Sequence, residues 1–361
     1  MNFEQTADQQ MLSEMLGRYL ADRYGFAERC RIAASDRGWS DGHWARFGEL
    51  GIIGALFGEA GGGFGGDGFD IAAVFEQLGR GLVVEPFLGT LMAGVALDGT
   101  LPEALLSGDE LWAFAHGEPA SRHELEVLAT QAIPDGAGWS LTGEKAVVPQ
   151  IESAAQLIVT AMAPSGPSLF RVERDGAGVV VRGYPMIDGG RGGDLTLCAT
   201  PATLIGSAGE AQAVIEQALS AGIVALCWEA IGIMDVMRTA TLDYMRTRQQ
   251  FGVTIGSFQA LQHRMGTVTL EIEQARSAAI RAAAALSSAR QPRERAVSAA
   301  KFTVGRVGTL VVEEAIQIHG GIAMTWDLPL SHYAKRLTMI DHQLGDQDYH
   351  LDHFIALAAA A

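Results

Sequence analysis

The sequence contains few charged residues, and basic residues are the scarcer kind. Only 19% of the 361 residues are charged, and 42 acidic against 26 basic side chains give a net charge of −16 at pH 7. An acidic surface repels both nucleic acid and anionic lipid, and no cluster of lysine and arginine offsets it. We therefore expect neither nucleic acid nor a membrane surface among the partners.

Cysteine is also scarce, and its spacing fits no known framework. The three cysteines, Cys30, Cys198 and Cys227, are odd in number and far apart, with neither disulfide-rich nor zinc-site spacing. The prediction is three buried free thiols in a reducing cytoplasm. A cluster of His342, His350 and His353 with nearby aspartates admits a metal site, but a solvated or interface helix face is the favoured interpretation, so no metal is predicted.

Long hydrophobic runs are missing, although hydrophobic residues make up 48% of the chain. Runs such as Leu50–Phe57 are too short to cross a bilayer. The first residues, Met1–Gln5, lack the basic start and apolar core of a signal peptide. We expect a cytoplasmic protein with a large hydrophobic core.

Residues 1–110 are predicted to form an N-terminal helical domain. Ser40 has the character of an N-cap for a helix that carries Trp44, Phe47 and Leu50. The glycine-rich stretch Gly58–Asp67 suggests a phosphate loop, but it lacks the Lys-Ser/Thr ending of a Walker motif and no strand precedes it. A tight connector between helices is the favoured alternative.

Residues 111–207 change to a period of two, which is typical of strands. Four short β-type runs are separated by turn residues: 156–160, 168–172, 179–182 and 194–198. The glycine-containing segments 134–138 and 173–178 are predicted turns. This pattern predicts a small antiparallel, barrel-like β domain.

Residues 208–361 are again helical, with apolar stripes at helical spacing. The three stripes begin at Ile223, Phe258 and Val304 and run to Tyr244, Ile272 and Ile318, respectively. Pro292 is expected near the start of one helix. Long helices joined by short turns predict a four-helix bundle, so the fold class is mainly α with a central β domain.

The junction Arg248–Gly252, followed by Gln259, brings unusual chemistry to a helix–helix connection. Arginine offers a planar fork for phosphate, phenylalanine an aromatic face, and glutamine an amide for a base edge. These are the groups needed to hold a dinucleotide. Taken alone, Arg246 and Arg248 are better explained as surface cations near a helix C-terminus. The presence of Phe251, Gln259 and the Gly320-Gly321 element favours the cofactor role.

The motifs and their order resemble the acyl-CoA dehydrogenase family over essentially the whole chain. Four landmarks carry the resemblance: Tyr244–Gly252 with Ile255–His263, Gln317–Gly321 with Met324 and Thr325, Gly143–Lys145, and Gly58–Gly62. The resemblance implies a helical domain, a β domain and a four-helix bundle, with FAD as cofactor and acyl-CoA as substrate. It also implies that FAD crosses a subunit interface, where Arg248, Phe251, Gln259, Gln317, Gly320 and Gly321 contact the neighbour's cofactor.

Both positions at which the family carries its catalytic base lack a carboxylate here. The segment that matches the family's Tyr-Glu-Gly-Thr is Gln343–Asp346, and Leu344 occupies the glutamate position. The alternative position, on the first bundle helix, is Gly222. Glu229, on that same helix, and Asp346 remain candidate displaced bases, with a structural role favoured for Glu229.

The flavin-ring contacts of the family also differ. Val147-Val148-Pro149 replaces an aromatic-Ile-Thr segment, and proline provides neither a hydroxyl nor a backbone N–H. His116–Ser121 replaces the family's Thr-Glu-Pro region. The chain therefore keeps the groups it would donate to a neighbour and lacks those it would use itself.

Three further segments resemble the small subunits of pimeloyl-CoA-dehydrogenase-type enzymes, which also occur in steroid degradation: Ala115–Pro119, Phe258–Arg264 and Leu344–His350. That resemblance implies a larger partner subunit in an α2β2 assembly, a lipid or steroid acyl-CoA substrate, and an electron-transfer flavoprotein as acceptor. Two alternatives stay open. One is a self-sufficient homomeric dehydrogenase with a displaced base, and the other is a non-catalytic scaffold.

Overall fold

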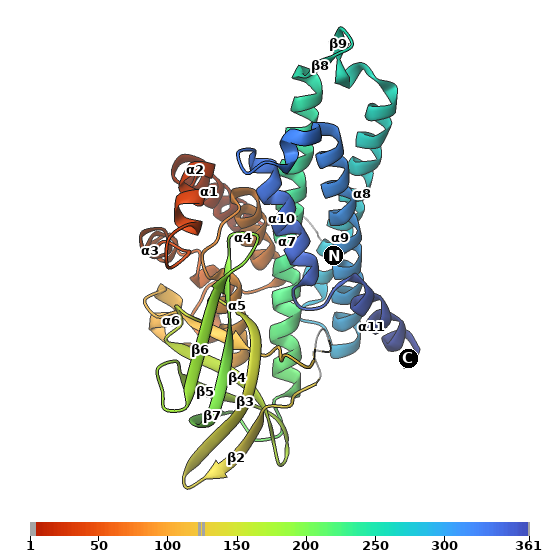
Figure 1. The fold of residues 1–361 in the computed structure, drawn as a ribbon. Helices are drawn as coiled ribbons and strands as arrows, with labels where there is room; N and C mark the ends of the chain where they lie inside the picture. Colours follow the sequence, from red (N-terminus) through yellow and green to blue (C-terminus); the bar gives the residue numbers. More distant parts are fainter. Residues whose placement is uncertain (1–4, 122–123, 125–126, 360–361) are drawn as a thin grey trace. The chain divides into compact units, whose positions relative to one another are not determined.

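The computed structural model describes residues 5–121, 124 and 127–359. The segment Met1–Gln5, on which the expectation about a signal peptide rests, lies almost entirely outside this range. The chain separates into two compact units, each assembled from several stretches of sequence. Figure 1 shows the course of the chain through them.

The first unit comprises Met1–Arg29, Ala72–Val83 and Val224–Ala361. Its long helices are α7 (Gln212–Thr247, which begins in the other unit), α8 (Gln259–Ala285), α9 (Arg290–His319) and α10 (Pro329–His342). It also contains α1 (Ala7–Arg23), α11 (Gln347–Ala359), the short strands β8 (Gln249–Gln250) and β9 (Val253–Thr254), and the 3-10 turns η3 (Ile255–Ser257) and η4 (Gly320–Met324). α9 packs against α8, α10 and α11.

The apolar stripes of α7 and α9 are buried, as their periodicity predicts. Met234 and Met237 of α7, and Val304 and Val311 of α9, are each at most 1% exposed. The predicted α8 stripe is buried from Met265 onward, but Phe258 is 38% exposed because it is the N-cap residue rather than part of the helix. The interpretation of Phe258 as a core residue was wrong.

Helix α4 (Gly68–Gly81) crosses α7 at very short backbone distance. A Cβ atom added to Gly79 would lie 2.1 Å from the carbonyl oxygen of Glu229, and one added to Gly232 would lie 2.1 Å from that of Glu76. No larger side chain fits at either position without moving the backbone. The two glycines therefore fix how closely these helices approach each other.

Among the described residues, α7 is the one helix that is long and apolar enough to span a membrane. However, 94% of its most apolar window is buried inside the protein. That degree of burial is typical of a core helix, and α7 includes the charged residues Glu229 and Asp235.

The second unit comprises Cys30–Ile71 and Val84–Ile223. Its helical part holds the end of α2 (Phe26–Ala33), α3 (Asp41–Glu49), α5 (Phe87–Leu97) and α6 (Glu103–Ser107), with 3-10 turns η1 (Gly54–Leu56) and η2 (Glu59–Gly61). The Ser40 hydroxyl accepts from the His43 amide and caps α3, as predicted. The glycine-rich loop is a connector: a Cβ on Gly63 would lie 2.1 Å from the Phe57 carbonyl oxygen.

The sheet of this unit has seven strands: β1 (Trp112–Ala115), β2 (Gln131–Asp135), β3 (Gly138–Pro149), β4 (Gln156–Ala163), β5 (Gly166–Glu173), β6 (Val179–Pro185) and β7 (Arg191–Ile205). The four predicted β runs all lie within strands. The sheet is mainly antiparallel, as predicted, but β1 and β2 each pair with β4 in parallel. The β2–β3 hairpin intervenes in sequence between β1 and β4, and such a crossover permits parallel pairing.

Candidate functional site

The junction after α7 is a tight hairpin between β8 and β9. Its two turn residues, Phe251 and Gly252, have φ angles of +55° and +82°. Two consecutive positive φ values define the turn that best joins twisted strands, but such turns usually carry Asn or Gly at the first position. Phe251 is instead an aromatic residue in a strained conformation, and it is 92% exposed. The positive φ costs conformational energy, and a ring so exposed adds little to the stability of the fold. The residue therefore favours a role in binding.

Arg248 closes the hairpin through its backbone and leaves its side chain available. Its amide donates to the Tyr244 carbonyl over 2.8 Å, and its own carbonyl accepts from the Ile255 amide over 2.9 Å. The neighbouring Arg246 forms an ion pair with Asp243. Within residues 5–121, 124 and 127–359, the Arg248 guanidinium has no such carboxylate and is exposed.

Gln317, Gly320 and Gly321 lie at the C-terminal end of α9 and are all exposed. Gly320 has a φ angle of +69°, and a Cβ atom added to it or to Gly321 would meet nothing within 4 Å. The packing of this chain therefore does not itself require glycine at position 321. The space beside it is free for another molecule to approach the backbone.

Tyr244 joins the hairpin to the end of α9. Its ring stacks on His319 with centroids 4.3 Å apart, and its hydroxyl donates to the His319 carbonyl over 3.3 Å. Because Tyr244 lies one helical turn before Arg248, this contact places the two predicted binding motifs at the same end of the bundle. Figure 1 shows the β8–β9 hairpin at that end.

Exposed apolar side chains surround these motifs. Val253 is 44% exposed on β9, while Ile322, Met324 and Trp326 on and after η4 are 50%, 72% and 63% exposed. Phe258 lies at the base of the hairpin, with its ring centroid 6.3 Å from that of Phe251. A concentration of large apolar side chains at the surface is typical of a protein–protein or ligand interface.

Glu229 is engaged in a buried ion pair. Both of its carboxylate oxygens accept from Arg336 of α10, at 2.6 and 2.7 Å, and Arg336 donates in addition to Gln343. The Glu229 side chain is 7% exposed. Both oxygens of this carboxylate are therefore occupied by a structural partner.

Asp346 has a structural contact of its own. Its Oδ1 accepts from the Tyr349 amide over 2.9 Å in the first turn of α11. This is the contact of a helix-capping carboxylate. Both candidate bases named from the sequence, Glu229 and Asp346, therefore have structural partners.

The segment around Leu344 keeps an unusual backbone although it carries no carboxylate. Leu344 and Gly345 have φ angles of +55° and +93°. The Lys301 ammonium donates to the carbonyls of Asp341 and Gly345 at 2.8 and 2.6 Å, and His350 Nε2 donates to the Leu344 carbonyl at 2.8 Å. Three buried hydrogen bonds thus hold the loop in a conformation that leucine alone disfavours.

In the β unit, Val147 lies at a bulge between β3 and β7 with a φ angle of +52° and is 51% exposed. A positive φ is a strong outlier for a β-branched residue. Val147, the buried Val148 and Pro149 offer no hydroxyl group, and His116 contacts Thr160 instead of facing outward. The side chains of this segment therefore present no hydroxyl group at the surface.

Glu118 and Lys145 form a fully buried pair that the sequence did not predict. The Lys145 ammonium donates to Glu118 over 2.7 Å and also to the His116 carbonyl and the Thr160 hydroxyl. Burial alone would raise the pKa of Glu118, but Lys145 and the amides of Ala129 and Thr130 outweigh it and hold that pKa below its usual value. Burial lowers the pKa of Lys145 to about 8. The Gly143–Lys145 landmark is thus a structural anchor of the β unit.

Several predictions about histidine and cysteine were wrong. His350 is 2% exposed and Asp341 is 9% exposed, so these two residues do not lie on a solvated helix face. They contact Ser298 and Lys301, respectively, in the first half of α9. His263 is exposed, whereas His319 is buried. Cys227 is buried, but Cys30 is half-buried and Cys198 lies on the outer side of β7. No group of three or more metal-ligating side chains occurs among the described residues.

Known proteins identify the family. The model described as "Acyl-CoA dehydrogenase, N-terminal domain" matches residues 6–99, and "Acyl-CoA dehydrogenase, C-terminal domain" matches residues 206–356. The probable acyl-CoA dehydrogenase YngJ of Bacillus subtilis is 28% identical over 344 residues, which cover 89% of this chain and 90% of that protein.

Solved structures share the fold. A steroid ACAD described as Tcur3481-Tcur3483 matches with a TM-score of 0.90 and 28% identity over 98% of both chains. The ChsE4-ChsE5 complex from Mycobacterium tuberculosis matches with a TM-score of 0.91 and 22% identity over 100% of both chains, which shows the fold alone. The predicted fold class is confirmed, and the chain belongs to the acyl-CoA dehydrogenase family, whose members use FAD.

Proposed function

We propose that this chain is the small subunit of a heteromeric acyl-CoA dehydrogenase and that a larger subunit supplies the catalytic base. One contrast carries the proposal. The residues that would reach a neighbour's cofactor are exposed, and the Arg248 guanidinium has no carboxylate partner in the part of the chain that the structure describes, whereas the positions for this chain's own base hold Leu344 and Gly222. The Tcur3481-Tcur3483 steroid ACAD, 28% identical, supports a two-component assembly.

In this assembly the hairpin and the end of α9 hold the adenosine and pyrophosphate half of the partner's FAD. The Arg248 guanidinium pairs with the pyrophosphate through its planar fork. Phe251 packs on the cofactor, and Gln259 and Gln317 donate or accept hydrogen bonds at its polar edges. When bound, FAD accepts the hydride from the β-carbon of the acyl-CoA.

Gly320 and Gly321 let the backbone approach the adenosine end closely, since no Cβ stands in the way. The exposed apolar residues of the hairpin and η4 become buried against the partner on assembly. Such burial explains why an otherwise acidic chain keeps Met324 and Trp326 at its surface. The α2β2 stoichiometry, a lipid or steroid acyl-CoA substrate and an electron-transfer flavoprotein as acceptor complete the proposal.

The first alternative is a homomeric dehydrogenase that uses Glu229 or Asp346 as its base. The bidentate contact of Glu229 with Arg336 and the capping contact of Asp346 both count against it. The second alternative is a scaffold that binds no flavin. The 92% exposed ring of Phe251 counts against a scaffold that binds no cofactor, because an aromatic side chain left unpacked at a turn with positive φ favours a role in binding.

The test is co-expression with the product of the adjacent reading frame, followed by measurement of flavin per chain. The proposal expects about one FAD per two chains in the complex, from one cofactor shared by each pair, and an absorbance band near ~450 nm. Arg248→Gln should remove flavin from the complex. Arg246→Gln, which changes a paired arginine on the same turn, should leave it bound.

Two results would overturn the proposal. One is an isolated chain that carries a full complement of FAD and oxidises acyl-CoA at a rate comparable to the complex. The other is a complex whose flavin content is unaffected by Arg248→Gln. A colourless complex would favour the scaffold instead.

A further inference from the structure

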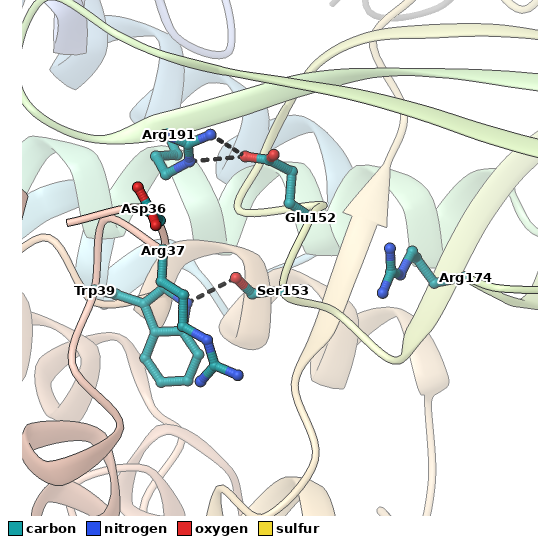
Figure 2. Close-up of a pocket in the computed structure, with 7 residues that line it drawn as sticks. All are labelled: Asp36, Arg37, Trp39, Glu152, Ser153, Arg174 and Arg191. Atoms are coloured by element: carbon teal, nitrogen blue, oxygen red, sulfur yellow. Dashed lines mark hydrogen bonds and ion pairs between the residues drawn. The ribbon is translucent and has the colours of Figure 1, made fainter.

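A second concave site lies wholly within the unit that contains the sheet. Its cavity of about 330 Å³ is bordered by the loop after α2, the segment after β3, the end of β5 and the start of β7. Figure 2 shows the seven lining residues: Asp36, Arg37, Trp39, Glu152, Ser153, Arg174 and Arg191. None of them belongs to the residues proposed to hold FAD.

Three of the seven lining residues are arginine, in a chain whose net charge is −16. Arg191 is neutralised within the pocket, because its Nε and one terminal nitrogen each lie 2.7 Å from the Glu152 carboxylate. Arg37 pairs with Asp41, which does not line the cavity and whose side chain is 68% exposed. Asp36 is the second lining carboxylate, so three arginines against two carboxylates leave the lining residues with a net charge of +1.

Arg174 provides the decisive observation. Its Nε is buried and has no hydrogen-bond partner among the described residues. The neighbouring Asp175, whose side chain is 82% exposed, forms an ion pair with this guanidinium: its Oδ1 lies 3.1 Å from Nε without completing a hydrogen bond, and its Oδ2 accepts from Nη2 over 3.4 Å. Buried N–H donors are almost always satisfied in folded proteins, so the unsatisfied Nε at this cavity points to a missing acceptor. In Figure 2 no lining residue contacts this guanidinium.

Ser153 can add a second donor beside Arg174. Its Oγ accepts from Trp39 Nε1 over 2.7 Å, which leaves the hydroxyl proton free to donate. The Arg37 guanidinium lies over the Trp39 ring, 5.6 Å from the centroid. The donors thus belong to side chains that are themselves held in place.

The walls of the pocket depend on two glycines. A Cβ added to Gly38, whose φ is +68°, would lie 2.4 Å from Cδ of Arg191. A Cβ added to Gly183 would lie 1.6 Å from the carboxylate carbon of Glu152. The Arg191–Glu152 pair occupies the space that these glycines leave open. Glycine at both positions is therefore needed for the pair to form this side of the pocket.

We propose that this pocket binds a small anion through a phosphate or carboxylate group. Arg174 supplies the principal charge-assisted hydrogen bonds, Ser153 donates one more, and Arg37 contributes positive charge at the mouth. The Arg191–Glu152 pair shapes the wall and does not take part in recognition. This site is separate from the FAD-binding residues, and its occupancy does not depend on the proposed dehydrogenase activity.

The test is isothermal titration of the full chain, as purified, with inorganic phosphate and separately with succinate, at constant ionic strength set with chloride. We expect saturable binding of at least one of the two anions with a stoichiometry of one, and at least ten-fold weaker binding to Arg174→Gln. Arg182→Gln, which changes a 79% exposed arginine on β6, is the matched control and should bind as the wild type does. Saturation by phosphate but not succinate assigns a phosphate ligand, and the reverse assigns a carboxylate.

Absence of saturable binding by both anions would overturn the proposal, as would equal affinity in wild type and Arg174→Gln. Ser153→Ala is the second variant if Arg174→Gln fails to fold, with an expected three- to ten-fold loss of affinity and unchanged affinity as the contradicting result. Flavin per chain in the co-purified complex should be the same in all these variants. A loss of anion binding with flavin unchanged separates this site from the proposed FAD contacts.

Discussion

Tyr244 and His319 connect the two sequence motifs from which an FAD contact was predicted. Their rings stack at 4.3 Å with an interplanar angle of 22°, and the Tyr244 hydroxyl donates to the His319 carbonyl. Burial lowers the pKa of His319, so the ring is neutral at pH 7 and stacks without a charge. The contact couples the position of Arg248 to that of Gly320, since each lies close in sequence to one of the two rings.

Tyr244→Phe keeps the stacking and removes the hydroxyl, whereas Tyr244→Leu removes both. The hydroxyl contact is worth about 1 kcal/mol, so Tyr244→Phe should lose little stability and retain flavin in the complex. Tyr244→Leu should release flavin at least ten-fold more readily, because the two halves of the site are no longer held together. Flavin fluorescence after dilution measures the release, and equal release from both variants would contradict a positioning role.

Phe251→Ala should separate binding from stability. Because the side chain is 92% exposed, its removal should change the free energy of unfolding by no more than about 0.5 kcal/mol. Flavin retention in the complex should nevertheless fall markedly. Ile133→Ala, at a 57% exposed position on β2, is the control and should affect neither quantity. Unchanged flavin retention in Phe251→Ala would remove this residue from the site.

Glu229→Gln tests whether this carboxylate is a base or a structural partner. The substitution removes the buried carboxylate that accepts two hydrogen bonds from Arg336, and we expect a loss of about 3 kcal/mol of stability. Arg336→Met combined with Glu229→Gln should restore part of that loss. Urea denaturation gives the stabilities, and acyl-CoA oxidation by the complex gives the activity per folded enzyme. Abolished activity with wild-type stability would reinstate Glu229 as the base.

The arrangement of helices and strands was largely predictable because it depends on local periodicity. The alternation around Gln156 and Val179, the cap at Ser40 and the stripe along α9 all reflect contacts within one element. The exceptions involve residues at ends of elements. Phe258 has helical spacing but precedes α8, and β1 pairs in parallel although each strand alone carries no sign of direction.

For the candidate FAD-contact site, the sequence predicted which residue types are present but not their conformations, exposure or contacts. Nothing in the spacing indicates that Phe251 takes a positive φ or that its ring is exposed, because both depend on the turn that the flanking strands impose. Glu229 and Arg336 are 107 residues apart, and only the packing of α7 against α10 brings them together. The unsatisfied Nε of Arg174 likewise follows from the burial of that atom, which has no local signal in the sequence.

Lys145→Met should strongly destabilise the β unit. The substitution leaves Glu118 buried without its counter-ion, at an expected cost of about 3–5 kcal/mol. Lys145→Met combined with Glu118→Leu should cost clearly less, since neither charge then remains buried. Thermal denaturation monitored by circular dichroism measures both. Equal destabilisation by the single and double substitutions would show that packing, and not the uncompensated charge, dominates.

His350 should make stability depend on pH between about 3 and 6.5. Burial and, next, the Lys301 ammonium lower the pKa of His350 to about 3, and the ring contacts the Ser298 hydroxyl as well as the Leu344 carbonyl. The folded-state pKa lies below the unfolded value near 6.5, so the unfolded chain binds the proton first as pH falls. The stabilisation is complete above pH 6.5 and is lost progressively as pH falls toward 3.

The loss attributable to this one proton should reach about 2 kcal/mol between pH 7 and pH 5. Other titrating groups also respond to acid, so the informative quantity is the difference between wild type and His350→Gln. The variant should be less stable than wild type at pH 7, because glutamine does not fill the same buried space, yet it should lose about 2 kcal/mol less between the two pH values. Urea denaturation at pH 7 and pH 5 measures both differences. An equal loss in the two proteins would show that His350 does not remain neutral in the folded state and that another group causes the acid sensitivity.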